Sequence, residues 1–118
     1  MTQVGLKHST WLDFILWLLR LRRRVRVAGA SMFPLLNAGD ILLFNPYAYR
    51  RRPPQPGELV VAYHPHKAKL KIIKRVAFIT PDGRYHVRGD NRAASTDSDT
   101  FGPIPSKLIL GQITSRFP

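Results

Sequence analysis

Six short apolar runs, each closed by a turn-forming segment, constrain the fold of this chain more than any other feature. The runs are 25–28, 41–45, 59–63, 69–79, 84–88 and 108–114. Gly, Pro, Asn and Asp gather between them, and such residues favour turns over continued strands or helices. Runs of this length and composition are typical of strands. We therefore predict a mainly β fold, a small antiparallel β-domain over residues 25–118, with a hairpin at Pro81-Asp82-Gly83.

One helix is expected ahead of this domain, over residues 9–21. Thr10 can cap it, and Asp13 stands three residues later, where a carboxylate favours a helix N-terminus. The apolar stretch from Trp11 to Leu19 makes about 14 Å of helix, against a hydrocarbon core of roughly 30 Å, so a comfortable transmembrane span is not expected. No small-residue cleavage site follows, so we do not expect a removable signal peptide. Residues 1–24 are predicted to form a helix and basic segment. Three alternatives are open for this segment: it lies in a membrane interface, it packs on its own domain, or it anchors the chain in a membrane through residues 9–21.

The charge of the chain is strongly positive, with 19 Lys and Arg against 7 Asp and Glu, a net charge of +12. Such a balance favours anionic partners, either nucleic acid or anionic lipid head groups, although solvated surface charge is a further explanation. The arginines form two blocks, Arg20, Arg22, Arg23, Arg24 and Arg26, then Arg50, Arg51 and Arg52. Cysteine is absent, which excludes disulfides, thiol catalysis and cysteine–zinc sites.

Lys74 breaks the pattern of the run at 69–79. Strand alternation places Leu70, Ile72, Val76 and Phe78 on an inner face, and Lys69, Lys71, Ile73 and Arg75 on an outer face. Lys74 then falls among the inner apolar residues. A buried lysine must be paired or lose its proton, and a neutral lysine is a general base. The alternative is a lysine at a sheet edge whose ammonium reaches solvent.

Two other stretches carry chemistry-bearing side chains. Ser31 lies in a Gly/Pro-containing loop, where it is either a simple turn residue or a nucleophile that needs a base. The polar stretch at 89–104 carries acids and hydroxyls, and Phe101 and Ile104 can anchor it as an ordered loop. His64 and His66 could share a strand face as metal ligands, but Pro65 favours a surface turn, and no metal site is expected.

Together, three motifs in this order resemble the signal peptidase I family of serine endopeptidases. They read Ser31-Met32-Phe33-Pro34, then Lys74-Arg75-Val76, then Gly89-Asp90-Asn91 with Ser95-Thr96-Asp97-Ser98 and Phe101-Gly102; Gly39-Asp40 also fits. Within the family, the chain looks closest to the maturation proteases of nickel-type superoxide dismutase, on His64-Pro65-His66-Lys67 and the spacing of the later motifs. The resemblance implies a substrate with a short N-terminal presequence, the precursor of such a dismutase. A general type I signal peptidase is the alternative.

The resemblance also implies roles for single residues. Ser31 would be the nucleophile, with its backbone N–H holding the oxyanion, and Lys74 the general base. Ser95 would orient the lysine amine, while Asp90, Asp97 and Arg75 would give structural support, without a cofactor.

Two departures from the family stand out. Asp99 occupies a position that the family usually gives to an arginine that pairs with the residue at the Asp97 position. Either Arg88 or Arg92 replaces that arginine here, or the loop is less rigid. Gly29 stands where some members have an additional oxyanion-binding hydroxyl.

Topology and charge bear on the alternatives. Arginines after the apolar helix would place the domain on the cytoplasmic side, which favours a cytoplasmic enzyme, peripheral on the membrane, over a protease of exported proteins. A basic β-module that binds nucleic acid, using Tyr47 and Tyr49 beside 50–52, is the alternative from another class. It gives no reason for Lys74 to lie on an inner face, so a nucleic acid partner is not favoured.

Overall fold

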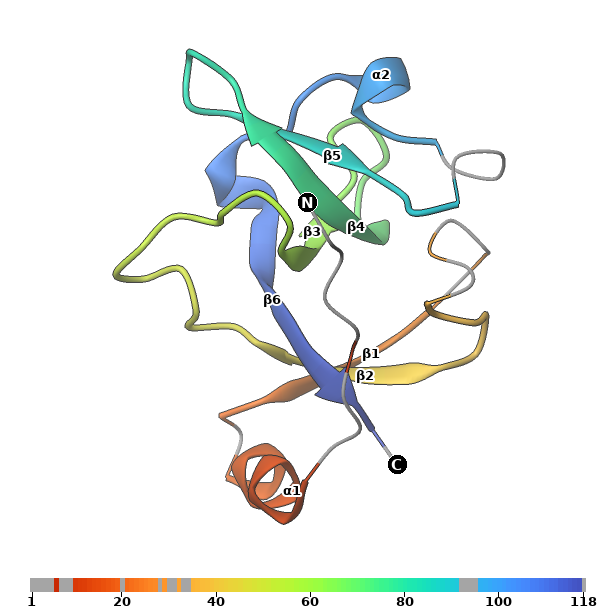
Figure 1. The fold of residues 1–118 in the computed structure, drawn as a ribbon, viewed down its shortest axis with the longest axis vertical. Coiled ribbons are helices and arrows are strands. Elements are labelled where there is room, and N and C mark those ends of the chain that lie inside the picture. The colour runs from red at the N-terminus through yellow and green to blue at the C-terminus, as the bar shows by residue number, and fades with distance from the viewer. Residues whose placement is uncertain are drawn as a thin grey trace.

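The computed structural model describes residues 6, 10–19, 21–27, 29, 32, 35–91 and 96–117. Its core is one antiparallel sheet with strand order β1-β2-β6-β3-β4-β5 (Figure 1). The strands are β1 (Arg23–Arg26), β2 (Ile41–Asn45), β3 (Leu59–Tyr63), β4 (Lys71–Ile79), β5 (Tyr85–Arg88) and β6 (Ile109–Arg116). The predicted mainly β, antiparallel fold is therefore confirmed.

Strand β6 joins the two parts of the sheet. It pairs with β2 on one side and with β3 on the other, and Figure 1 shows it running through the middle of the molecule. The hairpin predicted at Pro81-Asp82-Gly83 connects β4 to β5. The N–H of Thr80 donates to the carbonyl of Arg84 at 2.8 Å, and Gly83 has a φ of 83°, which glycine adopts without strain.

Apolar clusters cover both faces of the sheet at β3. Leu59 and Val61 belong to one cluster, and Val60 and Ala62 to the other, as alternation along a strand requires. The first cluster adds Val25, Val27, Met32, Leu36, Leu42, Phe44, Ile73 and Ile113; the second adds Val76, Tyr85, Val87, Phe101 and Ile104. Burial on both faces explains why β3 is an unbroken apolar run.

This two-sided burial corrects the faces predicted for β4. Ile73 and Arg75, expected on an outer face, are buried at 8% exposure each, because the first apolar cluster covers their side of the sheet. Leu70 and Phe78, expected inside, are 43% and 44% exposed. Leu70 precedes the strand, and a bulge between Val76 and Phe78 changes the pairing with β5.

Helix α1 (Trp11–Leu18) is shorter than the predicted 9–21. Its start is as expected: the Thr10 hydroxyl accepts from the N–H of Asp13, and the Asp13 carboxylate accepts from the N–H of Thr10, a capping box. Trp17 packs edge-on against Phe117, with ring centroids 5.0 Å apart. One side of the helix therefore contacts the end of β6. Among the described residues, no helix has the length and apolar character needed to cross a membrane.

Two short helices after β5 were not predicted. They are α2 (Ser98–Phe101) and a 3-10 helix (Ser106–Leu108). Both are too short for a periodic pattern to reveal. Phe101 and Ile104 are buried in the second apolar cluster, so the prediction that they anchor this polar stretch is confirmed. The division of the chain at residue 24 stays a prediction.

Candidate active site

Lys74 lies in the interior of the sheet, on the face covered by the second apolar cluster. It is 5% exposed, it pairs with Val60 of β3, and Val76 follows it on the same face. Burial disfavours the ammonium and lowers the pKa of Lys74 below its usual value, while the charge of Asp97 acts in the opposite direction. Because β4 is flanked by β3 and β5, the alternative of an edge lysine does not hold.

Arg75, the next residue, links all three sequence motifs from the opposite face of β4. Its Nε and Nη2 donate to the two carboxylate oxygens of Asp90, at 3.0 and 2.9 Å, and its Nη1 donates to the carbonyl of Gly57 at 2.8 Å. The N–H of Asp90 in turn donates to the sulfur of Met32 at 3.3 Å. Residues from the serine motif, the lysine motif and the Gly-Asp-Asn motif are therefore in one connected cluster.

Asp97 and Ser98, two residues of the third motif, lie on the other face of β4. Asp97 is buried and caps α2, since its carboxylate accepts from the N–H of Asp99 at 3.0 Å. The buried Ser98 hydroxyl accepts from the N–H of Val87 at 2.9 Å, which ties α2 to β5. Asp97 is thus held at a place where its charge acts on Lys74.

Asp99 is turned toward β5. Its carboxylate lies 3.1 Å from Nε2 of His86 and 4.0 Å from Nη2 of Arg88. Arg88, one of the two arginines proposed to replace the family's partner for Asp97, therefore approaches Asp99. The other, Arg92, lies outside the described residues.

His64 and His66 contact α2, which the sequence did not indicate. The His64 ring packs on Phe101 with centroids 4.8 Å apart, and Nε2 of His66 lies 3.0 Å from the carbonyl of Phe101. Nδ1 of His64 accepts from the N–H groups of His66 and Lys67, at 3.0 and 3.1 Å. The expected turn is present, since 65–67 form a bend. Its histidines contact the helix that Asp97 caps.

The burial of His64 and the nearby charges of Lys67, His66 and Lys74 lower the pKa of its imidazole. No group of three potential metal-ligating side chains occurs in the described ranges.

Ser31 and Ser95 lie outside the described residues. Their roles as nucleophile and lysine-orienting hydroxyl remain predictions, as does the oxyanion role of the Ser31 N–H. On either side of Ser31 the structure describes Gly29 and Met32. Gly29 has a φ of 84°, a conformation that disfavours a serine. The missing family hydroxyl is therefore consistent with the local backbone.

A comparison with protein-family models matches the chain to "Signal peptidase, peptidase S26", over residues 10–80 and 77–117. Among curated proteins, mitochondrial inner membrane protease subunit 2 of Danio rerio is 34% identical over 114 residues, covering 79% of this chain and 62% of that protein. Mitochondrial ATP-independent inner membrane protease subunit 1a of Arabidopsis thaliana is 32% identical over 112 residues, covering 76% and 67%. Probable signal peptidase I-1 of Synechocystis is 28% identical over 134 residues, covering 77% and 68%.

The matched relatives are named as inner membrane proteases and as a signal peptidase. The chain belongs to the signal peptidase family, peptidase S26. It spans just under two thirds of the length of the zebrafish relative.

Proposed function

We propose that this chain is a serine endopeptidase in which Ser31 is the nucleophile and Lys74 the general base. The observation that carries the proposal is the burial of Lys74 on an interior strand, with its pKa lowered. The neighbour of Lys74, Arg75, binds Asp90, and Asp90 contacts Met32, the neighbour of Ser31 in the chain. Membership of the peptidase family supports the same chemistry.

In the proposed reaction, the neutral amine of Lys74 takes the proton of the Ser31 hydroxyl as its oxygen attacks the scissile carbonyl. The N–H of Ser31 donates to the developing oxyanion. The Lys74 ammonium then protonates the leaving amine, and the acyl-enzyme forms. Lys74 next takes a proton from a water molecule as the water oxygen attacks the ester carbonyl. The Lys74 ammonium then returns the proton to the departing Ser31 oxygen, which restores both groups.

The remaining polar residues of the motifs have supporting roles in this proposal. Ser95 orients the Lys74 amine. Arg75 and Asp90 fix the position of the lysine strand relative to the serine motif. Asp97 limits how far the pKa of Lys74 falls, because its negative charge favours the ammonium.

For the substrate, we propose the precursor of a nickel-type superoxide dismutase, from which a short N-terminal presequence is removed. The support is the resemblance of His64-Pro65-His66-Lys67 and the later motifs to that subgroup. A general signal peptidase acting on exported preproteins is the second candidate, favoured by the likeness to probable signal peptidase I-1 of Synechocystis.

One experiment separates the two substrates. The chain is incubated with a dismutase precursor and, in parallel, with an exported preprotein, and the product N-termini are measured by mass spectrometry. Cleavage at one bond of the dismutase precursor alone supports the first candidate. Cleavage of the preprotein alone supports the second. If neither protein is cleaved, the proposed peptidase activity is contradicted.

A further inference from the structure

The two arginine blocks of the sequence meet on one face of the folded chain. A hollow of about 570 Å³ is lined by Trp17, Arg22, Arg23, Arg24 and Tyr47. The guanidinium of Arg50 lies 4.5 Å from the centroid of the Tyr47 ring.

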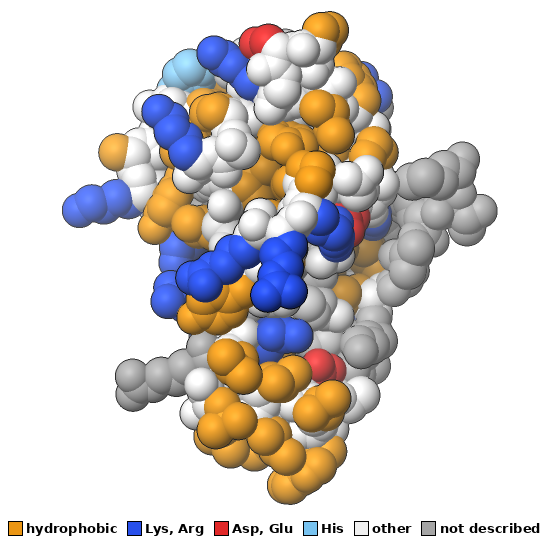
Figure 2. All heavy atoms as spheres, turned by 90° about the vertical axis from the view of Figure 1, so that its left-hand side faces the viewer, with side chains coloured by type: hydrophobic (Ala, Val, Ile, Leu, Met, Phe, Trp, Pro, Cys, Tyr) orange, Lys and Arg blue, Asp and Glu red, His pale blue; other side chains and the backbone are white. Residues whose placement is uncertain are grey.

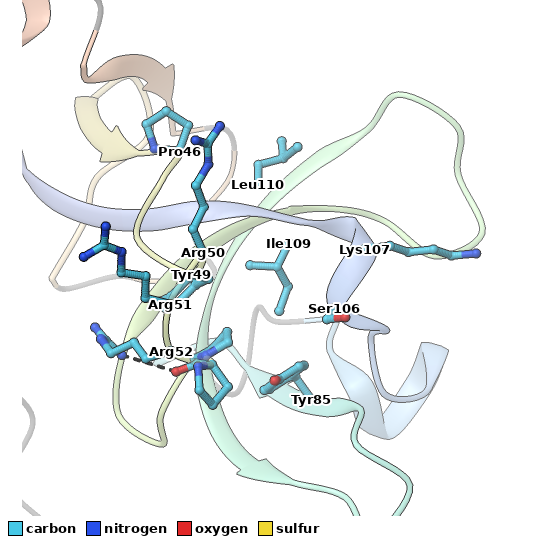
Figure 3. A pocket seen from close by; sticks show the side chains of 12 residues that line it. Pro46, Tyr49, Arg50, Arg51, Arg52, Tyr85, Ser106, Lys107, Ile109 and Leu110 are labelled. Atoms are coloured by element: carbon cyan, nitrogen blue, oxygen red, sulfur yellow. Dashed lines mark hydrogen bonds between the residues drawn. The ribbon is translucent and has the colours of Figure 1, made fainter.

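Arg50 and Arg51 line a second hollow, of about 520 Å³ (Figure 3). This hollow lies between β6 and the segment that follows β2. Tyr47 and Arg50 therefore connect the two hollows. We call Arg22, Arg23, Arg24, Arg50 and Arg51 the arginine surface.

Among the described residues, no acidic side chain compensates the charges of the arginine surface. In the described part of the chain, none of its members forms an ion pair with an acidic side chain, whereas the neighbouring Arg52 pairs with Glu58 at 2.8 Å. Nε of Arg22 is buried without a hydrogen-bond partner in that part. Arg24 is held by aromatic rings, 5.1 Å from the centroid of Trp17 and 5.8 Å from that of Phe117. The surface thus presents guanidinium donors suited to an anion with several oxygens.

An apolar face lies next to the arginine surface. Helix α1 contributes Trp17 to the first hollow, while Trp11, Leu12, Leu18 and Leu19 are 75%, 62%, 58% and 63% exposed. Figure 2 shows apolar side chains gathered at the lower end of the molecule, where Figure 1 places α1, with a band of basic side chains directly above them. A cationic band beside exposed tryptophan and leucine is the arrangement of a surface that lies in a bilayer interface.

We propose that α1 and the arginine surface form one docking site for an anionic phospholipid bilayer. Head-group phosphates enter the hollow between Trp17 and Tyr47, while the exposed side chains of α1 enter the interface. Nucleic acid would satisfy the arginines but offers no apolar phase to the three exposed leucines. The inference does not rest on peptidase activity, since lipid binding is measured without a substrate.

The first test measures binding of the full chain to vesicles by co-sedimentation. We expect binding to vesicles of phosphatidylcholine with phosphatidylglycerol, and little to phosphatidylcholine alone. Arg23→Gln and Arg51→Gln should each lower the partition coefficient about fivefold, and the double variant by about the product, since each arginine near the surface contributes about the same favourable energy. Arg84→Gln, in the hairpin before β5 at the opposite edge of the sheet from β1, is the matched control and should bind as wild type.

The second test follows the apolar face. Trp17→Phe leaves Trp11 as the single tryptophan, and its fluorescence should shift to shorter wavelength when anionic vesicles are added. A soluble single-stranded oligonucleotide should not displace the chain from vesicles at equal charge concentration. The proposal is overturned if binding ignores phosphatidylglycerol, if Arg51→Gln binds as wild type, if Trp11 shows no shift, or if the oligonucleotide displaces the chain.

Discussion

Arg75 binds both carboxylate oxygens of Asp90, through Nε at 3.0 Å and Nη2 at 2.9 Å, with both side chains largely buried at 10% and 7% exposure. This pair fixes strand β4 relative to the loop after β5. Because Lys74 precedes Arg75, the same contact determines where the proposed base stands relative to the third motif. A buried two-point pair gives geometric definition as well as energy.

We predict that Arg75→Met destabilises the fold by about 3–5 kcal/mol, because it leaves the Asp90 carboxylate buried without its guanidinium. Arg84→Met is the matched control. It removes an exposed pair, with Asp82 at 3.4 Å and side chains 54% and 66% exposed, and should cost under about 1 kcal/mol. Urea unfolding of both variants tests this, and equal losses would contradict the structural role given to Arg75.

The two serines Ser31 and Ser98 should respond differently to replacement by alanine. Ser31→Ala should abolish cleavage and leave the unfolding midpoint near that of wild type. Ser98→Ala should destabilise the fold by about 1–3 kcal/mol, because the buried N–H of Val87 loses its acceptor, with a milder effect on activity. Cleavage and thermal unfolding are measured on both, with the exposed Ser106→Ala as control. Loss of cleavage in both variants to the same extent would refute this division of roles.

The strands could be predicted from the sequence because each run has a β composition and ends in a turn-forming segment. The five runs from 41–45 to 108–114 match β2–β6 within two residues at either end. The faces of β4 could not be predicted, because two-residue alternation describes a strand with one covered face. In this sheet both faces are covered at 73–76, so Arg75 is as buried as the apolar side chains around it.

Contacts between distant segments were the other part that sequence could not supply. The burial of Lys74 could be predicted from its place between Ile72 and Val76. The packing of His64 on Phe101 joins residues 37 positions apart, and the meeting of Tyr47 with Arg22–Arg24 depends on how β1 and β2 pair. No local pattern records such contacts.

The lowered pKa of Lys74 predicts the direction of the pH–activity profile. Cleavage should increase with pH as the amine deprotonates and level off above that pKa. Asp97→Asn keeps an oxygen that can cap α2 but removes the charge that raises the pKa of Lys74. The rising limb should therefore move to lower pH in this variant. A limb that stays in place or moves to higher pH would contradict the electrostatic role of Asp97.

His64 should make the fold sensitive to acid. Its pKa is lowered in the folded state, so the unfolded state binds more protons between the folded pKa and the ordinary histidine value. Stability should fall as pH decreases through that window. His64→Asn supplies an oxygen acceptor that does not titrate and should weaken this pH dependence. Thermal unfolding at several pH values tests it, and an unchanged dependence would show that His64 is not the responsible group.

The burial that suits Lys74 to the proposed role of base should also cost stability. Below the pKa that Lys74 has in the folded state, the buried ammonium destabilises the fold by its full amount. Between that pKa and the higher pKa of the unfolded state, the unfolded state binds more protons, so stability increases as pH rises. Lys74→Met removes the amine and keeps an apolar stem. The variant should be as stable as wild type or more stable, by about 0.5–2 kcal/mol near neutral pH. The difference should shrink in alkaline solution, which unfolding at pH 7 and pH 10 would show.

The most direct test of the proposed Ser31–Lys74 pair is cleavage of the dismutase precursor by Lys74→Met and Lys71→Met, with products identified by mass spectrometry. Both variants remove one amine from β4, but Lys71 is exposed and Lys74 is buried. Lys74→Met should lose at least the ~10²–10⁴-fold that general-base catalysis contributes, while remaining folded. Lys71→Met should cleave at nearly the wild-type rate. An active Lys74→Met, or an inactive but folded Lys71→Met, would contradict the assignment of Lys74 as the base.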